Sequence, residues 1–189
     1  MKIFIKNMVC NRCITAVANI FEKSEIQFST IQLGEVETAS EVSESDLNQL
    51  QSNLEEIGFE IIKSPSQQLI ENVKNLIILK IGRLDTDENF VLSNFLSDAL
   101  HRDYSSLSKV FSQNEKTTLE QYYILQKIEK VKELLFNNDF TLTEIAGHMG
   151  YKSVQHLSTQ FKATTGHTPT EFKKLKVLDR KPLDFVGVL

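Results

Sequence analysis

One pattern occurs twice in this chain and decides its fold. It runs LSDALHRDYSSLSKVF at residues 96–111 and IAGHMGYKSVQHLSTQF at residues 145–161. In each copy, apolar residues at helical spacing end at a short polar break, and a second stretch with the same spacing follows. A short helix, a tight turn and a second helix make a helix-turn-helix unit. The sequence therefore predicts two such units, with a shorter turn in the first.

The residues at both breaks suit the end of one helix and the start of another. Gly150 favours the left-handed conformation that ends a helix, and Ser153 is a good N-cap for the next helix. In the first unit His101 stands at the left-handed position and Asp103 at the N-cap. Three capping boxes are predicted to start helices: Thr117/Glu120, Thr141/Glu144 and Thr168/Glu171, the last with Pro169 at the first helical position.

A long amphipathic helix is predicted between the two units. At about 1.5 Å per residue, a helix of about 20 residues spans about 30 Å, close to the roughly 34 Å of one DNA turn. Such a helix can place two recognition helices in successive major grooves. Its apolar positions are Leu119, Tyr122, Leu125, Ile128, Val131, Leu134 and Leu135.

Residues 71–176 resemble the AraC-type DNA-binding domain. The stretch IEKVKELL at 128–135 matches the signature of its linking helix. TEIA at 143–146, GY at 150–151, FK at 161–162 and GHTP at 166–169 match the signature of its second half. The resemblance implies a sequence-specific transcription regulator with double-stranded DNA as its partner.

The resemblance also carries DNA-contacting positions onto the second helix of each unit. The family often has Arg where Lys109 and Thr159 stand, so Thr159 weakens the expectation of base readout by the second unit. A phosphate contact or plain solvent exposure is the alternative at every position. The six candidates are Ser105, Ser108, Lys109, Gln155, Thr159 and Lys162; Leu107, Phe111, Leu157 and Phe161 are expected in the core.

The first 64 residues follow a different pattern. Polar and apolar residues alternate over 2–6, and residues 28–33 and 35–39 are predicted to form two strands joined by a tight turn at Gly34. Helical spacing starts at Cys13 and again over 46–57, where Leu47, Leu50, Leu54 and Ile57 share a face and Gly58 ends the helix; a strand over 59–62 follows. The order βαββαβ predicts a ferredoxin-like α+β domain ahead of the all-α half.

Four segments are therefore expected. A ferredoxin-like domain covers 1–64, a linker 65–70, the two helix-turn-helix units with their long helix 71–176, and a tail 177–189. A buried helix with Leu69, Ile70, Val73, Leu76, Ile77 and Ile81 opens the helical half, and a polar break at 85–89 follows it. The apolar end of the tail is expected to pack on the amino-terminal unit or on a second chain.

A pair of cysteines lies between the first strand and the first helix, in Met8-Val9-Cys10-Asn11-Arg12-Cys13. Thiols at i and i+3 can face one soft cation, and a helix N-terminus lowers thiol pKa values. Soft thiolates select Cu(I) or Zn(II). Cu(I) suits two sulfurs, whereas Zn(II) usually needs four ligands and hence a second chain or added thiols.

This unit resembles the heavy-metal-associated domain of copper chaperones and metal-transporting ATPases. The shared features are the βαββαβ order, the Met-x-Cys-x-x-Cys loop and the late pair Gly58-Phe59. The resemblance implies Cys10 and Cys13 as metal ligands and Met8 as a core residue. Asn7, where the family commonly has Gly, and the short hairpin depart from it.

Two other interpretations of the cysteine pair, and one other of the whole chain, stay open. A thioredoxin-like redox dithiol requires a helix after the central strand of a larger fold. A dimerisation or protein-interaction module would keep the two thiols without a metal. A metal-trafficking protein would use its helical half to bind proteins, and DNA affinity separates it from the others. We expect a metal-responsive regulator, in which a coupling free energy links metal and DNA.

Composition and charge agree with a globular DNA-binding protein. The 189 residues are 41% hydrophobic and 24% charged, as in soluble two-domain chains. Residues 1–65 carry a net charge of −5 and residues 66–189 one of +1, with +3 over 141–176. A basic patch of this size is a modest footprint for nucleic acid, and a solvated charged face would look the same.

Several functions are not expected. No stretch reaches the roughly 18 apolar residues of a membrane helix, and no signal peptide is present, so a cytoplasmic protein without membrane contact is expected. Two cysteines cannot form a disulfide framework. Phosphate loops and nucleophile elbows are missing, and no histidine stands at triad or zinc-ligand spacing. The chain is therefore not expected to be an enzyme or to use a small-molecule substrate; whether it forms a homodimer is open.

Overall fold

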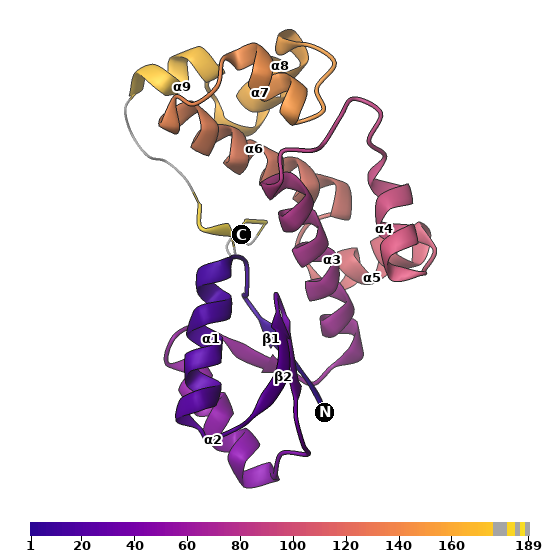
Figure 1. Cartoon of the computed structure of the whole chain (residues 1–189). Helices are drawn as coiled ribbons and strands as arrows, with labels where there is room; N and C mark the ends of the chain where they lie inside the picture. The colour runs from indigo at the N-terminus through magenta and orange to yellow at the C-terminus, as the bar shows by residue number, and fades with distance from the viewer. Residues whose placement is uncertain (176–180, 184–185, 188–189) are drawn as a thin grey trace. The chain divides into compact units, whose positions relative to one another are not determined.

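The computed structural model describes residues 1–175, 181–183 and 186–187. They form two compact units, residues 1–75 and the described residues from 76 onward. The first is an α+β unit and the second is helical (Figure 1), so the predicted fold class is confirmed. None of the described helices is long and apolar enough to cross a membrane.

The first unit has the predicted βαββαβ order. The sheet order is β2-β3-β1-β4, and every neighbouring pair is antiparallel. Central strand β1 pairs Ile3 with Val36 of β3 and Ile5 with Ile61 of β4. The elements are β1 (Lys2–Lys6), α1 (Asn11–Lys23), β2 (Phe28–Gln32), β3 (Glu35–Thr38), α2 (Glu44–Glu55) and β4 (Glu60–Ile62).

Helices α1 and α2 lie side by side against one face of this sheet (Figure 1). The alternation along β1 turns Ile3 and Ile5 toward the helices, where they are buried with Val17, Phe21 and Leu50. Fully burying one such side chain stabilises a fold by roughly 1.5–3 kcal/mol. The common core therefore holds the sheet and the two helices together.

Ile57 does not share this core. It was expected on the apolar face of the second helix, yet it is 47% exposed. Helix α2 ends at Glu55, and Gly58 turns the chain with a φ of +86° before β4. The helix stop predicted at Gly58 is therefore present, but it leaves Ile57 outside the helix.

Helix α3 (Pro65–Gly82) corrects the predicted linker. Residues 65–70 are its first turns, and the boundary between the two units falls inside the helix, after Asn75. The amide of Gln68 donates to the carbonyl of Ser64 at 3.0 Å, which places Pro65 at a first helical position, where a missing N–H is tolerated. The Asn75 side chain donates to the carbonyl of Leu33 at 3.2 Å, which ties α3 to the β2–β3 hairpin.

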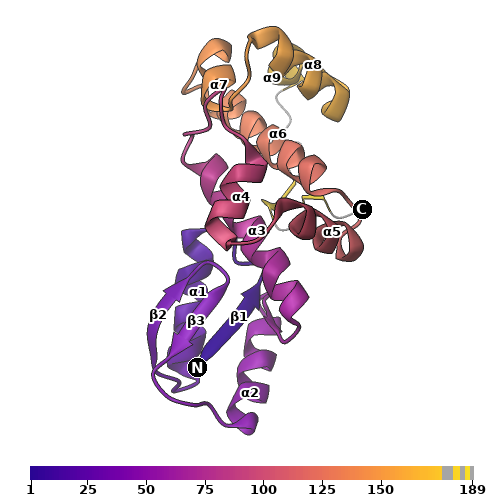
Figure 2. The same ribbon diagram turned by 90° about the vertical axis from the view of Figure 1, so that its right-hand side faces the viewer.

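The second unit contains both predicted helix-turn-helix units and the long helix between them. In each unit the two helices pack together, and α6 contacts helices of both units (Figure 2). Leu96, Leu107 and Phe111 are buried in the first unit, and Ile145, Leu157 and Phe161 in the second. The helices are α4 (Leu92–Leu100), α5 (Tyr104–Asn114), α6 (Leu119–Asn137), α7 (Leu142–His148), α8 (Val154–Thr165) and α9 (Pro169–Leu175).

The turns have the predicted backbone conformations. His101 has a φ of 51° and Gly150 one of 67°, both left-handed. The hydroxyl of Ser153 caps α8 by accepting from the amide of His156 at 3.1 Å. Asp103 occupies the N-cap position of α5, but its side chain makes no capping hydrogen bond.

Two of the three predicted capping boxes are present. Thr141/Glu144 and Thr168/Glu171 form both reciprocal hydrogen bonds. Thr117/Glu120 is wrong, because α6 starts one residue later and Thr118 accepts from the amide of Gln121 at 3.1 Å. The Glu120 carboxylate instead accepts from the hydroxyl of Tyr104 at 2.7 Å, a partner 16 residues away in sequence.

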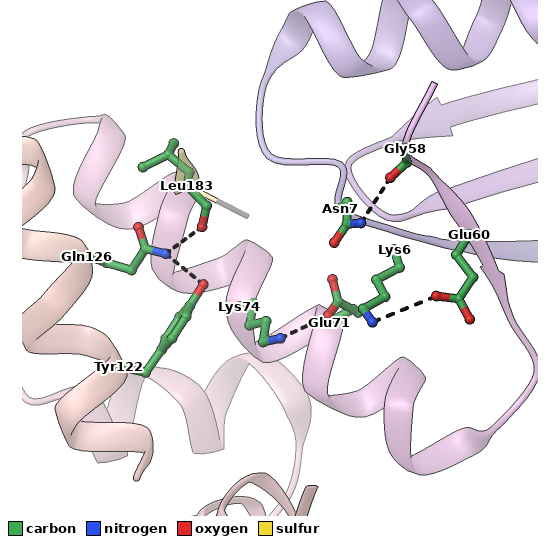
Figure 3. A network of polar contacts seen from close by, with 9 residues as sticks. All are labelled: Lys6, Asn7, Gly58, Glu60, Glu71, Lys74, Tyr122, Gln126 and Leu183. Carbon is green, nitrogen blue, oxygen red and sulfur yellow. Dashed lines mark hydrogen bonds and ion pairs between the residues drawn. The ribbon is translucent and has the colours of Figure 1, made fainter. Parts of the chain in front are cut away.

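The described part of the tail packs against α6, within the helical unit. The amide of Lys181 donates to the Glu129 carboxylate at 3.1 Å. The Gln126 side chain donates to the carbonyl of Leu183, also at 3.1 Å (Figure 3). The expectation that the tail packs on the amino-terminal unit or on a second chain is thus wrong for these residues. Buried polar groups on α6 explain the contact, because they need hydrogen-bond partners; residues 176–180, 184–185 and 188–189 lie outside the described residues.

One buried hydroxyl in the helical unit lacks a partner. Thr86, in the segment between α3 and α4, is 2% exposed, and its Oγ1 makes no hydrogen bond within the described part of the chain. Burying a hydroxyl without a hydrogen bond is unfavourable.

We expect Thr86→Val to raise the free energy of unfolding of the helical unit by about 1–2 kcal/mol, since valine keeps the shape and removes the unpaired hydroxyl. Urea denaturation measures the change. The exposed Thr143→Val is the matched control and should alter stability by less than about 0.5 kcal/mol. A less stable Thr86→Val would contradict the assignment of an unpaired hydroxyl.

Candidate nucleic-acid interface and thiol site

The second helix of each unit, α5 or α8, has one buried and one exposed face. Leu107 and Phe111 of α5 and Leu157 and Phe161 of α8 are at most 1% exposed, as predicted. Of the six candidate DNA contacts, Ser105, Lys109, Gln155, Thr159 and Lys162 are exposed and Ser108 is half-buried. The buried faces hold both helices so that these polar residues face outward; their contact with DNA stays a prediction.

Gln155 and Thr159 differ in what they can offer a base. Gln155 lies in the first turn of α8 with its side chain exposed, and a glutamine amide both donates and accepts. The hydroxyl of Thr159 already donates to the carbonyl of Gln155 at 2.9 Å. Thr159 therefore retains only acceptor capacity, which fits its departure from the arginine common in the family.

Two basic residues occupy equivalent positions in the two turns. Arg102 precedes the N-cap Asp103, and Lys152 precedes the N-cap Ser153; both are exposed. Basic side chains beside a recognition helix suit phosphate contacts. Neither residue is among the six predicted DNA contacts, although the two repeats aligned at their N-caps place Arg102 opposite Lys152.

A buried lysine connects α6 with the second helix-turn-helix unit. The ammonium group of Lys127 lies 3.8 Å from the centre of the Tyr151 ring and 5.4 Å from that of Tyr123, which are cation–π distances. Burial lowers the pKa of Lys127 to about 8 and raises the pKa of both tyrosines. Tyr151 in turn donates to Gln160 of α8 at 2.7 Å and contacts the ring of His156.

Comparison with known proteins gives the same assignment for this half. Residues 96–175 match a family model described as "Helix-turn-helix domain". The xylose operon regulatory protein of Haemophilus influenzae is 33% identical over 76 residues, 40% of this chain and 20% of that protein. The HTH-type transcriptional activator RhaR of Mannheimia succiniciproducens is 24% identical over 156 residues, 70% of this chain and 56% of that protein.

Among solved structures, the C-terminal domain of the two-component response regulator yesN from Fusobacterium nucleatum is 32% identical, with a TM-score of 0.46 over 54% of this chain and 98% of that chain. The chain spans only about a fifth of the length of the xylose operon regulators that it matches.

The helical unit is a double helix-turn-helix domain, with two units on either side of one long helix. The family match covers residues 96–175, and the two signatures in the sequence agree with the resemblance to the AraC-type domain. These matches agree with the expected helix-turn-helix domain, and the matched relatives are regulatory proteins by name.

The loop with the two thiols sits at the start of α1. Cys10 is the N-cap, Cys13 lies in the first turn, and their sulfur atoms are 3.4 Å apart, too far for a disulfide bond. Met8 is 1% exposed and belongs to the core, as expected. The two thiols thus face each other at the edge of the unit, each half-buried.

Asn7 fits a position at which the resembling family has Gly. Its φ is 71°, a left-handed conformation that asparagine tolerates better than most residues. Its side chain donates to the carbonyl of Gly58 at 3.0 Å (Figure 3). Asn7 therefore replaces glycine and also ties the thiol loop to the turn before β4.

The two thiols differ in acidity, although the position beside a helix N-terminus was expected to lower both pKa values. At Cys10 burial opposes ionisation most strongly, but hydrogen bonds with Cys13 and Arg12 together outweigh it and lower the pKa. At Cys13 burial raises the pKa, and the hydrogen bond with Cys10 adds to the rise. Cys10 is thus the more acidic thiol.

The donor set suits a soft ion with few ligands. Among the described residues no group of three or more His, Cys, Asp or Glu could hold a metal. Two thiolate sulfurs are soft donors of the kind that Cu(I) takes. A tetrahedral Zn(II) site would need further ligands from outside these residues.

At about pH 7.5 we expect iodoacetamide to modify Cys10 faster than Cys13 in the full chain, because the thiolate is the nucleophile. Peptide mass spectrometry at short reaction times measures the order. The single cysteine of each variant gives the control. Cys10 in Cys13→Ser should react with iodoacetamide faster than Cys13 in Cys10→Ser. Faster modification of Cys13 in the unaltered chain would contradict the assignment.

Proposed function

We propose that this chain is a sequence-specific transcription regulator that binds double-stranded DNA through α5 and α8. The carrying observation is that two recognition helices, each buried on one face and polar on the other, are joined by one 19-residue helix. At about 1.5 Å per residue α6 spans roughly 28 Å, within reach of successive major grooves. The similarity to regulators such as RhaR supports the proposal.

Within this proposal the exposed residues have distinct roles. Gln155 and Lys109 read base edges, because an amide pairs with adenine in two hydrogen bonds and a lysine reaches the acceptors of guanine. Ser105, Ser108 and Thr159 add weaker contacts. Lys162, Arg102 and Lys152 bind phosphates and set the position of each unit on the duplex.

Lys109→Ala and Gln155→Ala should each weaken binding to the preferred site by roughly 1–3 kcal/mol and relax base preference at one position. Selection from random duplexes identifies the site, and fluorescence anisotropy at fixed salt measures affinity. Lys23→Ala and Gln67→Ala make the same chemical changes on exposed residues of the ferredoxin-like unit and should leave DNA affinity unchanged. The DNA proposal fails if selection at moderate salt enriches no motif.

We further propose that the ferredoxin-like unit makes this regulator responsive to a soft metal ion. Cys10 and Cys13 would hold one Cu(I), or two chains would share one Zn(II) through four sulfurs. The facing thiols and the lowered pKa of Cys10 support this over a dimerisation or protein-interaction module without metal. Helix α3 contains residues of the ferredoxin-like unit and of the helical unit. A conformational change in the ferredoxin-like unit would therefore be transmitted through one continuous helix.

A wild-type monomer should take up one Cu(I) in competition with a chromophoric chelator, and Cys10→Ser/Cys13→Ser should not. DNA affinity should change with metal in the wild type alone. Equal metal retention by both proteins, or DNA affinity indifferent to metal, would sink the sensor proposal, and a metal-independent dimer in sedimentation would then favour the dimerisation alternative. Metal binding without any DNA affinity would instead favour a trafficking protein.

A further inference from the structure

The loop between α3 and α4, residues 84–90 and here named the brace loop, contacts the turn of the second helix-turn-helix unit. Thr86 forms a parallel backbone bridge with Met149. The carbonyl of Leu84 lies 3.3 Å from Nδ1 of His148. A Cβ at Gly150 would lie 2.6 Å from the carbonyl oxygen of Asp87, so the two backbones approach too closely for any side chain.

The carboxyl end of the brace loop contacts the first helix-turn-helix unit and α6. The Phe90 ring lies 5.5 Å from Phe95 of α4 and 5.9 Å from Tyr123 of α6, between ring centroids. The ammonium group of Lys80 lies 5.2 Å from the centre of the Phe90 ring and 3.1 Å from the Asp85 carboxylate. These contacts hold one short loop against three helices.

The ring contacts continue from Tyr123 into the second unit. Lys127 lies between Tyr123 and Tyr151, with its ammonium group 5.4 Å and 3.8 Å from the two ring centres. Tyr151 contacts His156, on the exposed side of α8. A continuous series of side chains thus leads from Phe95 in the first helix-turn-helix unit to α8, the recognition helix of the second helix-turn-helix unit.

The brace loop gives the two helix-turn-helix units a second connection besides α6. Two bodies joined through a single helix can still rotate and bend about that connection, whereas a second connection along a different path fixes their angle. The contacts at Met149 and Gly150 on one side and at Phe95 on the other make the brace loop such a path.

The fit of the two recognition helices to their DNA half-sites depends strongly on the angle between the two helix-turn-helix units. With about 10–10.5 base pairs per turn, one added base pair rotates the second half-site by about 34–36° and moves it by about 3.4 Å. A rigid pair of recognition helices cannot follow that change, and a loosely joined pair can.

We infer that the brace loop, together with Lys127, determines the spacing between half-sites that this protein accepts on DNA. This inference rests on the proposed DNA-binding function. Phe90 and Lys127 are positioning residues in it, since neither lies on the exposed face of α5 or α8.

The test measures affinity for the selected site and for duplexes whose half-sites are moved apart or together by one or two base pairs. The wild type should prefer one spacing by at least about tenfold. Phe90→Ala and, as a variant with a conserved side-chain length, Lys127→Met should reduce this preference to less than about threefold while binding the best spacing within about threefold of wild type. Glu88→Ala, exposed on the same loop, is the matched control and should keep the wild-type profile.

Each outcome bears on a different claim. An unchanged spacing profile in both variants, or equal weakening at all spacings, overturns the inference. A wild type that binds its site at every spacing alike overturns the inference but leaves the proposed function intact. A wild type without specific DNA binding overturns both. Amide hydrogen exchange at Met149 and Gly150 should also increase in Phe90→Ala and not in Glu88→Ala, whether or not DNA is present.

Discussion

The packing of both helix-turn-helix units against α6 is the constraint on which the recognition surface depends. More than half of this helix is buried, including Gln126, Lys127, Glu129 and Lys132. Burial of polar groups is tolerated only when each finds a partner. Glu129 pairs with Lys132 at 2.9 Å, and Gln126 donates to the hydroxyl of Tyr122 at 2.8 Å and to the tail (Figure 3).

These partners have a consequence for the geometry of the domain. Apolar packing is non-directional and would permit several rotations of a unit about α6. Hydrogen bonds and cation–π contacts have preferred directions, and they fix one arrangement. The tail and the segment after α3 both supply such contacts, so residues outside the helix-turn-helix units help to determine where α5 and α8 point.

The ferredoxin-like unit shows a similar division between scaffold and chemistry. Its core holds β1 and α1 in place, and the connection between them carries Cys10 and Cys13. Asn7 fastens that connection to Gly58. The thiols are half-buried and unequal in acidity, and Cys10 is the more readily ionised of the two because hydrogen bonds lower its pKa.

The sequence by itself determined most features that depend on local periodicity, with Ile57 as an exception because α2 ends before it. The two helix-turn-helix units with their core positions, the βαββαβ order, the inward Met8 and two of the three capping boxes follow from spacing and from residues within a few positions of one another. The exposed face of α5 and α8 follows from the same periodicity.

Only the tertiary structure decided features that depend on partners far away in sequence. Glu120 pairs with Tyr104 and leaves the predicted capping box, the tail lies on α6, and the polar break after α3 packs on Gly150. The continuity of α3 through Pro65 and the unequal acidity of the two thiols belong to this second group, because burial and hydrogen-bond partners are set by the whole fold and not by the neighbouring residues.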